Sequence, residues 1–175
     1  MEDTKLPNIL VTGTPGVGKT TLCSLLESSL HEEGKTGYKY IMLAERIREE
    51  KLYKDWNKEF DVSEYDEDMV CDNLEDEMSK GGVILEFHSC GFFPERWFQL
   101  IVLLRCDNTH LYDRLAERGY DQNKITENIE CEIMEVTSEE VRESYKSDII
   151  LELANQEIDD VETNIEKIKE KLEQL

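Results

Sequence analysis

The run Gly-Thr-Pro-Gly-Val-Gly-Lys-Thr at residues 13–20 constrains the fold of this chain more than any other feature. It fits the pattern Gly-x-x-x-x-Gly-Lys-Thr, in which a glycine-rich loop surrounds the phosphates of a nucleotide. Before it, residues 9–11 are apolar, as expected of a buried strand. After it, residues 20–30 place four leucines on one helical face. Strand, loop and helix occur in the order that phosphate binding requires, whereas a glycine-rich turn with a chance lysine would need no such context.

Each residue type in the loop has a physical reason to be there. Glycines allow backbone N–H groups to approach a phosphate closely, at a helix N-terminus that carries a partial positive charge. Lys19 adds a full charge near the β- and γ-phosphates, and the Thr20 hydroxyl can ligate Mg²⁺. We therefore predict that ATP is bound by Gly13, Gly16, Val17, Gly18, Lys19, Thr20 and Thr21.

Net charge limits the partners of the chain. The 175 residues include 20 basic and 41 acidic side chains, a formal charge of −21. Direct contact with nucleic acid is disfavoured because its phosphates would be repelled. An ATP site must nevertheless attract an anion, so we expect arginines to be concentrated in the cleft. The acidic exterior suits a basic protein partner, although solubility alone would also account for it.

The cysteines and the N-terminus bear on location. Five cysteines are widely spaced without a Cys-x-x-Cys pair, which indicates neither a zinc site nor a disulfide framework. They are expected to be buried, reduced thiols of the cytosol or nucleus. No apolar run is long enough to span a membrane, and residues 1–5 lack the apolar core of a signal peptide. We expect a soluble intracellular protein without membrane contact.

Apolar strands alternate with amphipathic helices along the whole chain. This alternation predicts a single α/β domain over residues 1–175, with a parallel five-stranded sheet covered by helices on both faces. Residues 54–65 lack a period, which predicts a loop or mobile insert. Asn108 can cap the helix that follows it. The predicted strands are 9–11, 38–43, 83–87, 100–104 and 149–153, the helices are 20–30, 44–53, 66–80, 108–118, 126–145 and 158–172, and 92–97 is a short turn or helix.

Ligands of parallel sheets bind outside the carboxyl ends of the strands, which draws attention to two residues at the carboxyl end of the predicted strand 83–87. Glu86 lies where phosphate-loop proteins place the carboxylate that orients Mg²⁺; the alternative is a solvated strand-end acid. His88 would face the same crevice and could act as a base for water, or it could be a structural hydrogen-bonding residue.

Three arginines are candidates for neutralising phosphate charge. Arg48 lies on the helix after the second strand, Arg105 ends a strand, and Arg118 stands where a mobile lid could begin. A guanidinium group can bind phosphate with two parallel hydrogen bonds, although surface or structural roles are the alternative for each. The remaining arginines with weaker positional arguments are treated as helix-face charges: Arg46, Arg96, Arg114 and Arg142.

Three segments together resemble one family. The runs 12–21, 81–98 (with Phe-Phe-Pro-Glu-Arg-Trp-Phe at 92–98) and 118–133 are similar to the adenylate kinase isoenzyme 6 family, also described as coilin-interacting nuclear ATPase proteins. The similarity extends from Pro7 to about Leu153. It implies a phosphate-loop kinase fold, a nucleoside-monophosphate-binding segment near 42–65 that contains Arg48, and a short lid near 117–127 in which Arg118 contacts ATP.

The resemblance also implies adenylate kinase and ATPase activities with Mg²⁺, and AMP and ADP as substrate and product. It implies a part in small ribosomal subunit (18S rRNA) maturation through a basic ribosomal protein, in the nucleus and cytoplasm; we expect a monomer.

The sequence departs from the family pattern at two places. Glu86-Phe87-His88 replaces the family's Asp-x-His, and Ser89-Cys90-Gly91 replaces Gly-Cys-Asp. The longer glutamate makes the Mg²⁺-water role of the family's acid less secure at Glu86.

Two hypotheses for function follow. The first is an enzyme that converts ATP and AMP into two ADP, with Lys19, Glu86, His88 and Arg118 as its catalytic residues. The second is chiefly an ATPase switch for assembly that binds a basic protein, because a short lid would admit water. A GTPase is disfavoured, since Asn123-Lys124-Ile125-Thr126 lacks the aspartate that reads guanine. A small-metabolite kinase such as a shikimate kinase remains open from the loop alone.

Overall fold

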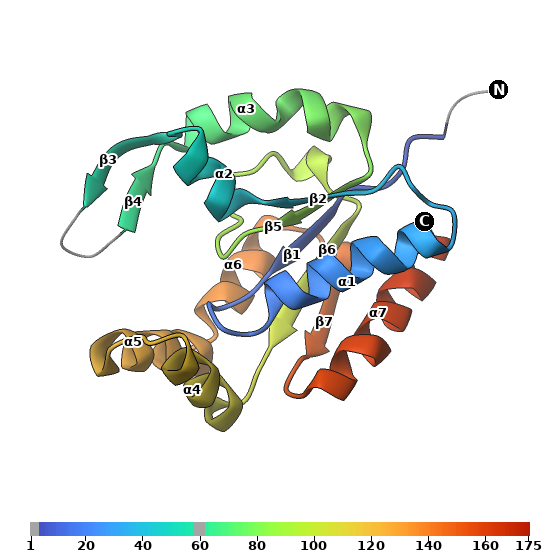
Figure 1. Cartoon of the computed structure of the whole chain (residues 1–175). Coiled ribbons are helices and arrows are strands. Elements are labelled where there is room, and N and C mark those ends of the chain that lie inside the picture. Colours follow the sequence, from blue (N-terminus) through green and yellow to red (C-terminus); the bar gives the residue numbers. More distant parts are fainter. Residues whose placement is uncertain (1–3, 58–61) are drawn as a thin grey trace.

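A five-stranded parallel sheet with strand order β2-β5-β1-β6-β7 forms the centre of the protein (Figure 1). The computed structural model describes residues 4–57 and 62–175. Helices lie on both faces of the sheet, which confirms the predicted fold class. The strands are β1 (Ile9–Thr12), β2 (Lys39–Met42), β5 (Val83–Glu86), β6 (Leu100–Arg105) and β7 (Ile150–Ala154).

The described residues form seven helices, of which six lie between strands of the sheet in chain order and the last follows the final strand (Figure 1). Two short 3₁₀ turns, Glu95–Trp97 and Ser147–Ile149, precede β6 and β7. The helices are α1 (Lys19–Glu32), α2 (Leu43–Glu49), α3 (Glu67–Lys80), α4 (Asn108–Glu117), α5 (Gln122–Ile133), α6 (Val136–Ser144) and α7 (Ile158–Glu173).

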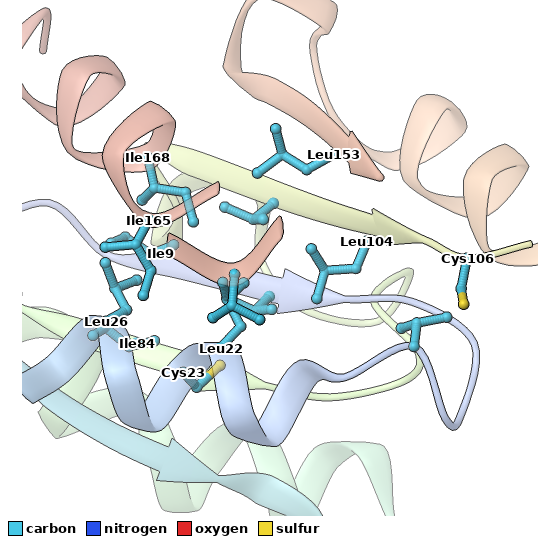
Figure 2. Close-up of a cluster of buried hydrophobic side chains, with 14 of the residues drawn as sticks. Ile9, Leu22, Cys23, Leu26, Ile84, Leu104, Cys106, Leu153, Ile165 and Ile168 are labelled. Carbon is cyan, nitrogen blue, oxygen red and sulfur yellow. The ribbon is translucent and has the colours of Figure 1, made fainter. Parts of the chain in front are cut away.

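The core is divided by the sheet into two clusters because successive side chains of a strand point to opposite faces. Ile9 and Val11 of β1 join the cluster beneath α1, α4, α5 and α7, part of which is drawn in Figure 2. Leu10, between them, joins the cluster beneath α2, α3 and α6. The strands are therefore apolar almost throughout, and polar side chains are left for their carboxyl ends.

The segment 54–65 differs from the prediction of a loop. Its described residues form an antiparallel hairpin, β3 (Tyr53–Asn57) and β4 (Val62–Tyr65), which extends from the body of the molecule in Figure 1; residues 58–61 lie outside the described part. The strands are short and their register shifts between Tyr53 and Asp55, so no periodic pattern marks them in the sequence. The preceding helix α2 also ends at Glu49, before Lys51 adopts a positive φ of 54°.

The predicted helix over 126–145 is two helices. Helix α5 already starts at Gln122, where the side chain of Asp121 accepts a hydrogen bond of 2.8 Å from the Lys124 N–H. Glu135 then adopts φ 55°, a left-handed conformation that ends the helical path between α5 and α6. The cap of α4 is likewise Asp107, which accepts from the His110 N–H at 2.9 Å, and not Asn108.

Within the described ranges, no helix has both the length and the apolar character that crossing a membrane would require.

Candidate nucleotide-binding site

The glycine-rich loop joins the end of β1 to the start of α1, as predicted. Gly16 and Gly18 have φ angles of +97° and +96°, which residues with a Cβ rarely adopt. Space is also limited: a Cβ on Gly16 would lie 2.8 Å from Leu111 Cδ1, and one on Gly18 would lie 2.5 Å from Asn155 Nδ2. Helix α1 begins at Lys19 and has no acidic residue in its first turn. Its N-terminus therefore keeps the partial positive charge that attracts an anion.

Lys19 is folded back over the loop. Its Nζ donates a hydrogen bond of 2.6 Å to the carbonyl oxygen of Gly13. Burial lowers the pKa of the ammonium group to about 8, and the carboxylate of Glu86 opposes that shift. Lys19 is thus mostly charged at neutral pH and is held beside the loop that would receive the phosphates.

Thr20 and Glu86 meet at the mouth of the loop, although one begins α1 and the other ends β5. The Thr20 hydroxyl donates to Glu86 Oε1 at 2.5 Å, and Glu86 is only 6% exposed. A hydroxyl and a carboxylate are hard oxygen donors of the kind that Mg²⁺ prefers. These two residues therefore fit the metal that the family would use, with Thr20 as a ligand and Glu86 as a ligand or an acceptor for metal-bound water.

Two pockets meet at the loop. The first, of about 270 Å³, is lined by six predicted site residues: Gly16, Lys19, Thr20, Glu86, His88 and Arg118. The second, of about 450 Å³, lies on the other side of the loop and is lined by Gly18, Thr21 and Arg114 among others. Gly16 and Arg118 border both. The site thus has room for ligands on two sides of one phosphate-binding loop.

His88 faces the first pocket and is exposed. Partial desolvation there, followed in size by the positive charge of Lys19, lowers the pKa of His88 to about 4. The ring is consequently neutral at pH 7 and can accept a proton or a hydrogen bond. Its centroid lies 4.4 Å from that of Phe87 and 6.4 Å from that of Tyr65 at the base of the β-hairpin.

The loop after His88 is fixed by a carboxylate from α6. Glu140 Oε1 accepts hydrogen bonds from the Ser89 hydroxyl at 2.8 Å and from the N–H groups of Cys90 and Gly91 at 2.9 and 2.7 Å. The Tyr145 hydroxyl donates to the Cys90 carbonyl at 3.0 Å. Ser89, which departs from the family pattern, thus contributes one of these bonds.

The three predicted arginines occupy different positions. Arg118 borders both pockets, is exposed, and has no ion-pair partner in the described part of the chain. Arg48 is exposed on α2 and lines neither pocket. Arg105 also lies outside both pockets, since its side chain forms ion pairs with three glutamates: Glu132, Glu135 and Glu152. The structure therefore brings Arg118 to the loop and leaves Arg48 and Arg105 away from it.

Two residues at the site were not predicted. Arg114 donates to the carbonyl oxygens of Gln156 and Asn155, the latter at 2.9 Å, and to that of Gly16 at 3.4 Å. Asn155 Nδ2 donates to the Val17 carbonyl at 2.8 Å. The sequence does contain signals for both: Arg114 lies one helical turn before Arg118, and Asn155 follows the end of β7, where polar residues of a parallel sheet gather.

Comparison with known proteins gives one consistent group. The family model described as "AAA domain" matches residues 9–135. The Adenylate kinase isoenzyme 6 homolog of Dictyostelium discoideum is 45% identical over 90% of this chain and 87% of its own length. The homologue of the same name from Drosophila melanogaster is 42% identical over 93% and 90%.

Solved structures agree in fold. A shikimate kinase from Bacteroides thetaiotaomicron superposes with a TM-score of 0.64 at 16% identity, over 95% of this chain and 98% of that one. A shikimate kinase from Acinetobacter baumannii has a TM-score of 0.62 at 18% identity, over 94% and 92%. At these identities the likeness concerns the architecture alone.

Proposed function

Since the chain belongs to the adenylate kinase isoenzyme 6 family, we propose that it transfers the γ-phosphoryl group of ATP to AMP and forms two molecules of ADP. Membership of this family, with its kinase-type phosphate loop, implies nucleotide substrates. In the proposed reaction the bond between the γ-phosphorus and the β,γ-bridging oxygen breaks, and a bond forms between that phosphorus and a phosphate oxygen of AMP. The bridging oxygen leaves on ADP.

The observation that carries the proposal is the pair of pockets that meet at Gly16 and Arg118, beside Lys19. Phosphoryl transfer depends mainly on positioning two phosphates in line and on neutralising charge. In the proposed reaction Lys19 and Arg118 stabilise the charge that develops on the transferred group. Bound Mg²⁺, held through Thr20 and Glu86, would supply further charge neutralisation on the phosphate oxygens.

We further propose that water can replace AMP as the acceptor, so that the protein also hydrolyses ATP. His88 supports this second activity because it faces the first pocket together with Lys19 and Glu86. A neutral imidazole can accept a proton from an attacking water. Suppression of hydrolysis requires a lid that excludes water, and the segment 117–127 is short for this purpose.

The cellular role is proposed from the family resemblance. We place the protein in small ribosomal subunit maturation, in the nucleus and cytoplasm, as a monomer that binds a basic ribosomal protein. The net charge of −21 supports a basic partner. In the alternative form of this proposal the ATPase switch is the main function and transfer to AMP is incidental.

One experiment separates these possibilities. ADP and inorganic phosphate are measured separately, first with ATP and Mg²⁺ alone and then with each nucleoside monophosphate added. Adenylate kinase activity predicts ADP formation that AMP stimulates, with little phosphate release. Phosphate release that is indifferent to every monophosphate would favour the ATPase switch, and no product in any mixture would refute both.

A further inference from the structure

We propose that Glu132 is a positioning residue of the phosphate loop, which it holds in place through the side chain of Thr14. Thr14 is the first variable residue of the loop motif, and its Oγ1 donates a hydrogen bond of 2.6 Å to Glu132 Oε2. Both residues are buried, with exposed fractions of 1% and 4%. The bond links positions 118 residues apart, from the loop to helix α5.

A buried carboxylate close to a phosphate site is unfavourable on charge alone, so its presence requires a compensating partner. Arg105 provides one: its Nε donates to Glu132 Oε1, and its Nη2 donates to the main-chain oxygen of Glu132 at 3.1 Å. Each oxygen of the carboxylate therefore has a donor of its own, Arg105 at Oε1 and Thr14 at Oε2. The charge of Glu132 is balanced, and its orientation is fixed from two sides.

What Thr14 fixes is the first bend of the loop. Its carbonyl oxygen accepts a hydrogen bond of 3.3 Å from the Val17 N–H, which closes the turn between them. A loop held in this shape before the nucleotide arrives loses less conformational freedom on binding, and its N–H groups need not reorganise. Arg105 acts through Glu132, and Glu132 acts through Thr14, so neither of them needs to touch the nucleotide.

The inference rests on the proposed function, and its test therefore measures binding as well as turnover. Thr14→Val removes the donor and Glu132→Ala removes the acceptor. Each is expected to raise the Kd for ATP with Mg²⁺, measured by calorimetry, about tenfold, the effect of losing one charge-assisted hydrogen bond. The double variant is expected to bind no more weakly than the weaker single variant, because both changes break the same bond. The KM for AMP should stay unchanged, whereas a variant whose whole fold is destabilised would show a changed KM for AMP as well.

Matched variants distinguish a loss of loop positioning from a general loss of folding as the cause of a raised Kd. Thr14→Ser keeps the hydroxyl donor, so its Kd should stay within about twofold of the wild type. Glu135→Gln removes another ion pair of Arg105, of 2.9 Å, without reaching the loop, and should leave Kd unchanged. Wild-type affinity in folded Thr14→Val, or additive losses in the double variant, would overturn the inference. Failure of the wild type to bind ATP would instead refute the proposed function.

Discussion

The hydroxyl of Thr20 donates a hydrogen bond of 2.5 Å to the carboxylate of Glu86, across 66 residues of sequence. This contact joins the first turn of α1 to the end of β5 and places two oxygen donors of the type that Mg²⁺ requires at one point. It arises from the strand order, since β1 and β5 are parallel neighbours whose carboxyl ends meet at the same edge of the sheet.

Replacing Glu86 should weaken the response to Mg²⁺. Glu86→Gln keeps an oxygen that can accept the Thr20 hydrogen bond but removes the charge. We expect the Mg²⁺ concentration for half-maximal turnover to rise about 10- to 100-fold, the usual effect of losing a group that orients metal ligands. The measurement is a Mg²⁺ titration of ADP formation after chelation with EDTA. Glu166→Gln, an exposed change on α7, is the control, and an identical Mg²⁺ dependence in both variants would contradict the role of Glu86.

Lys19→Ala should lower both transfer to AMP and hydrolysis by about 10²- to 10³-fold in kcat, because one preorganised charge beside the transferred group is lost. The assay measures ADP and phosphate separately. Lys35→Ala serves as control, since Lys35 forms only a half-exposed ion pair with Glu33. Turnover near the wild-type rate in Lys19→Ala would remove Lys19 from the mechanism.

His88 should titrate well below the ordinary histidine value of about 6.5. Its pKa of about 4 can be measured from the ring-proton shifts in an NMR titration, assigned with His88→Asn. Because the folded pKa is depressed, the unfolded chain binds the proton more tightly; the stability that this group contributes is complete above about pH 6.5 and is lost as the pH falls toward 4.

The proposed role of His88 as a base for water also predicts an effect on the rate of ATP hydrolysis. His88→Asn should depress ATP hydrolysis at pH 7 by about 10²-fold, the lower range for loss of a general base, and should change the Kd for ATP much less. Phosphate release and calorimetric binding are compared in the two proteins. Equal hydrolysis rates would leave His88 with a structural role.

Arg48→Ala tests the segment 42–65. If α2 and the β-hairpin close on the acceptor nucleotide, the exposed guanidinium of Arg48 contacts AMP, and its removal should raise the KM for AMP at least tenfold. The Kd for ATP should not change. Arg96→Ala, which removes an exposed partner of Glu75, is the control, and an unchanged KM for AMP in Arg48→Ala would exclude the contact.

The sheet and the phosphate loop could be predicted from the sequence because each depends on residues that are close together along the chain. Apolar runs such as 100–104 mark strands buried on both faces, and the loop motif has a fixed spacing. Glu86 and His88 could be placed at the same edge from the rule that ligands bind at the carboxyl ends of parallel strands.

The remaining features depend on partners that are distant in sequence. Arg105 was expected at the nucleotide from its place at the end of β6, but carboxylates of later elements draw its side chain elsewhere. Glu135 carries no local signal for a left-handed conformation, so the break between α5 and α6 could not be foreseen. Arg114 was set aside as a helix-face charge because its acceptors, Asn155 and Gln156, lie some forty residues later.

The bend at Glu135 has a consequence for anyone who redesigns this enzyme. It separates α5 from α6, so that a stretch of nine residues supplies Glu132 to Thr14 of the phosphate loop and Glu140 to the turn after His88. Grafting only the glycine-rich loop and Glu86 onto another scaffold would omit the hydrogen bonds that Glu132 and Glu140 make to the loop and to the turn after His88. A transplanted site would need these two carboxylates as well as the phosphate-loop motif.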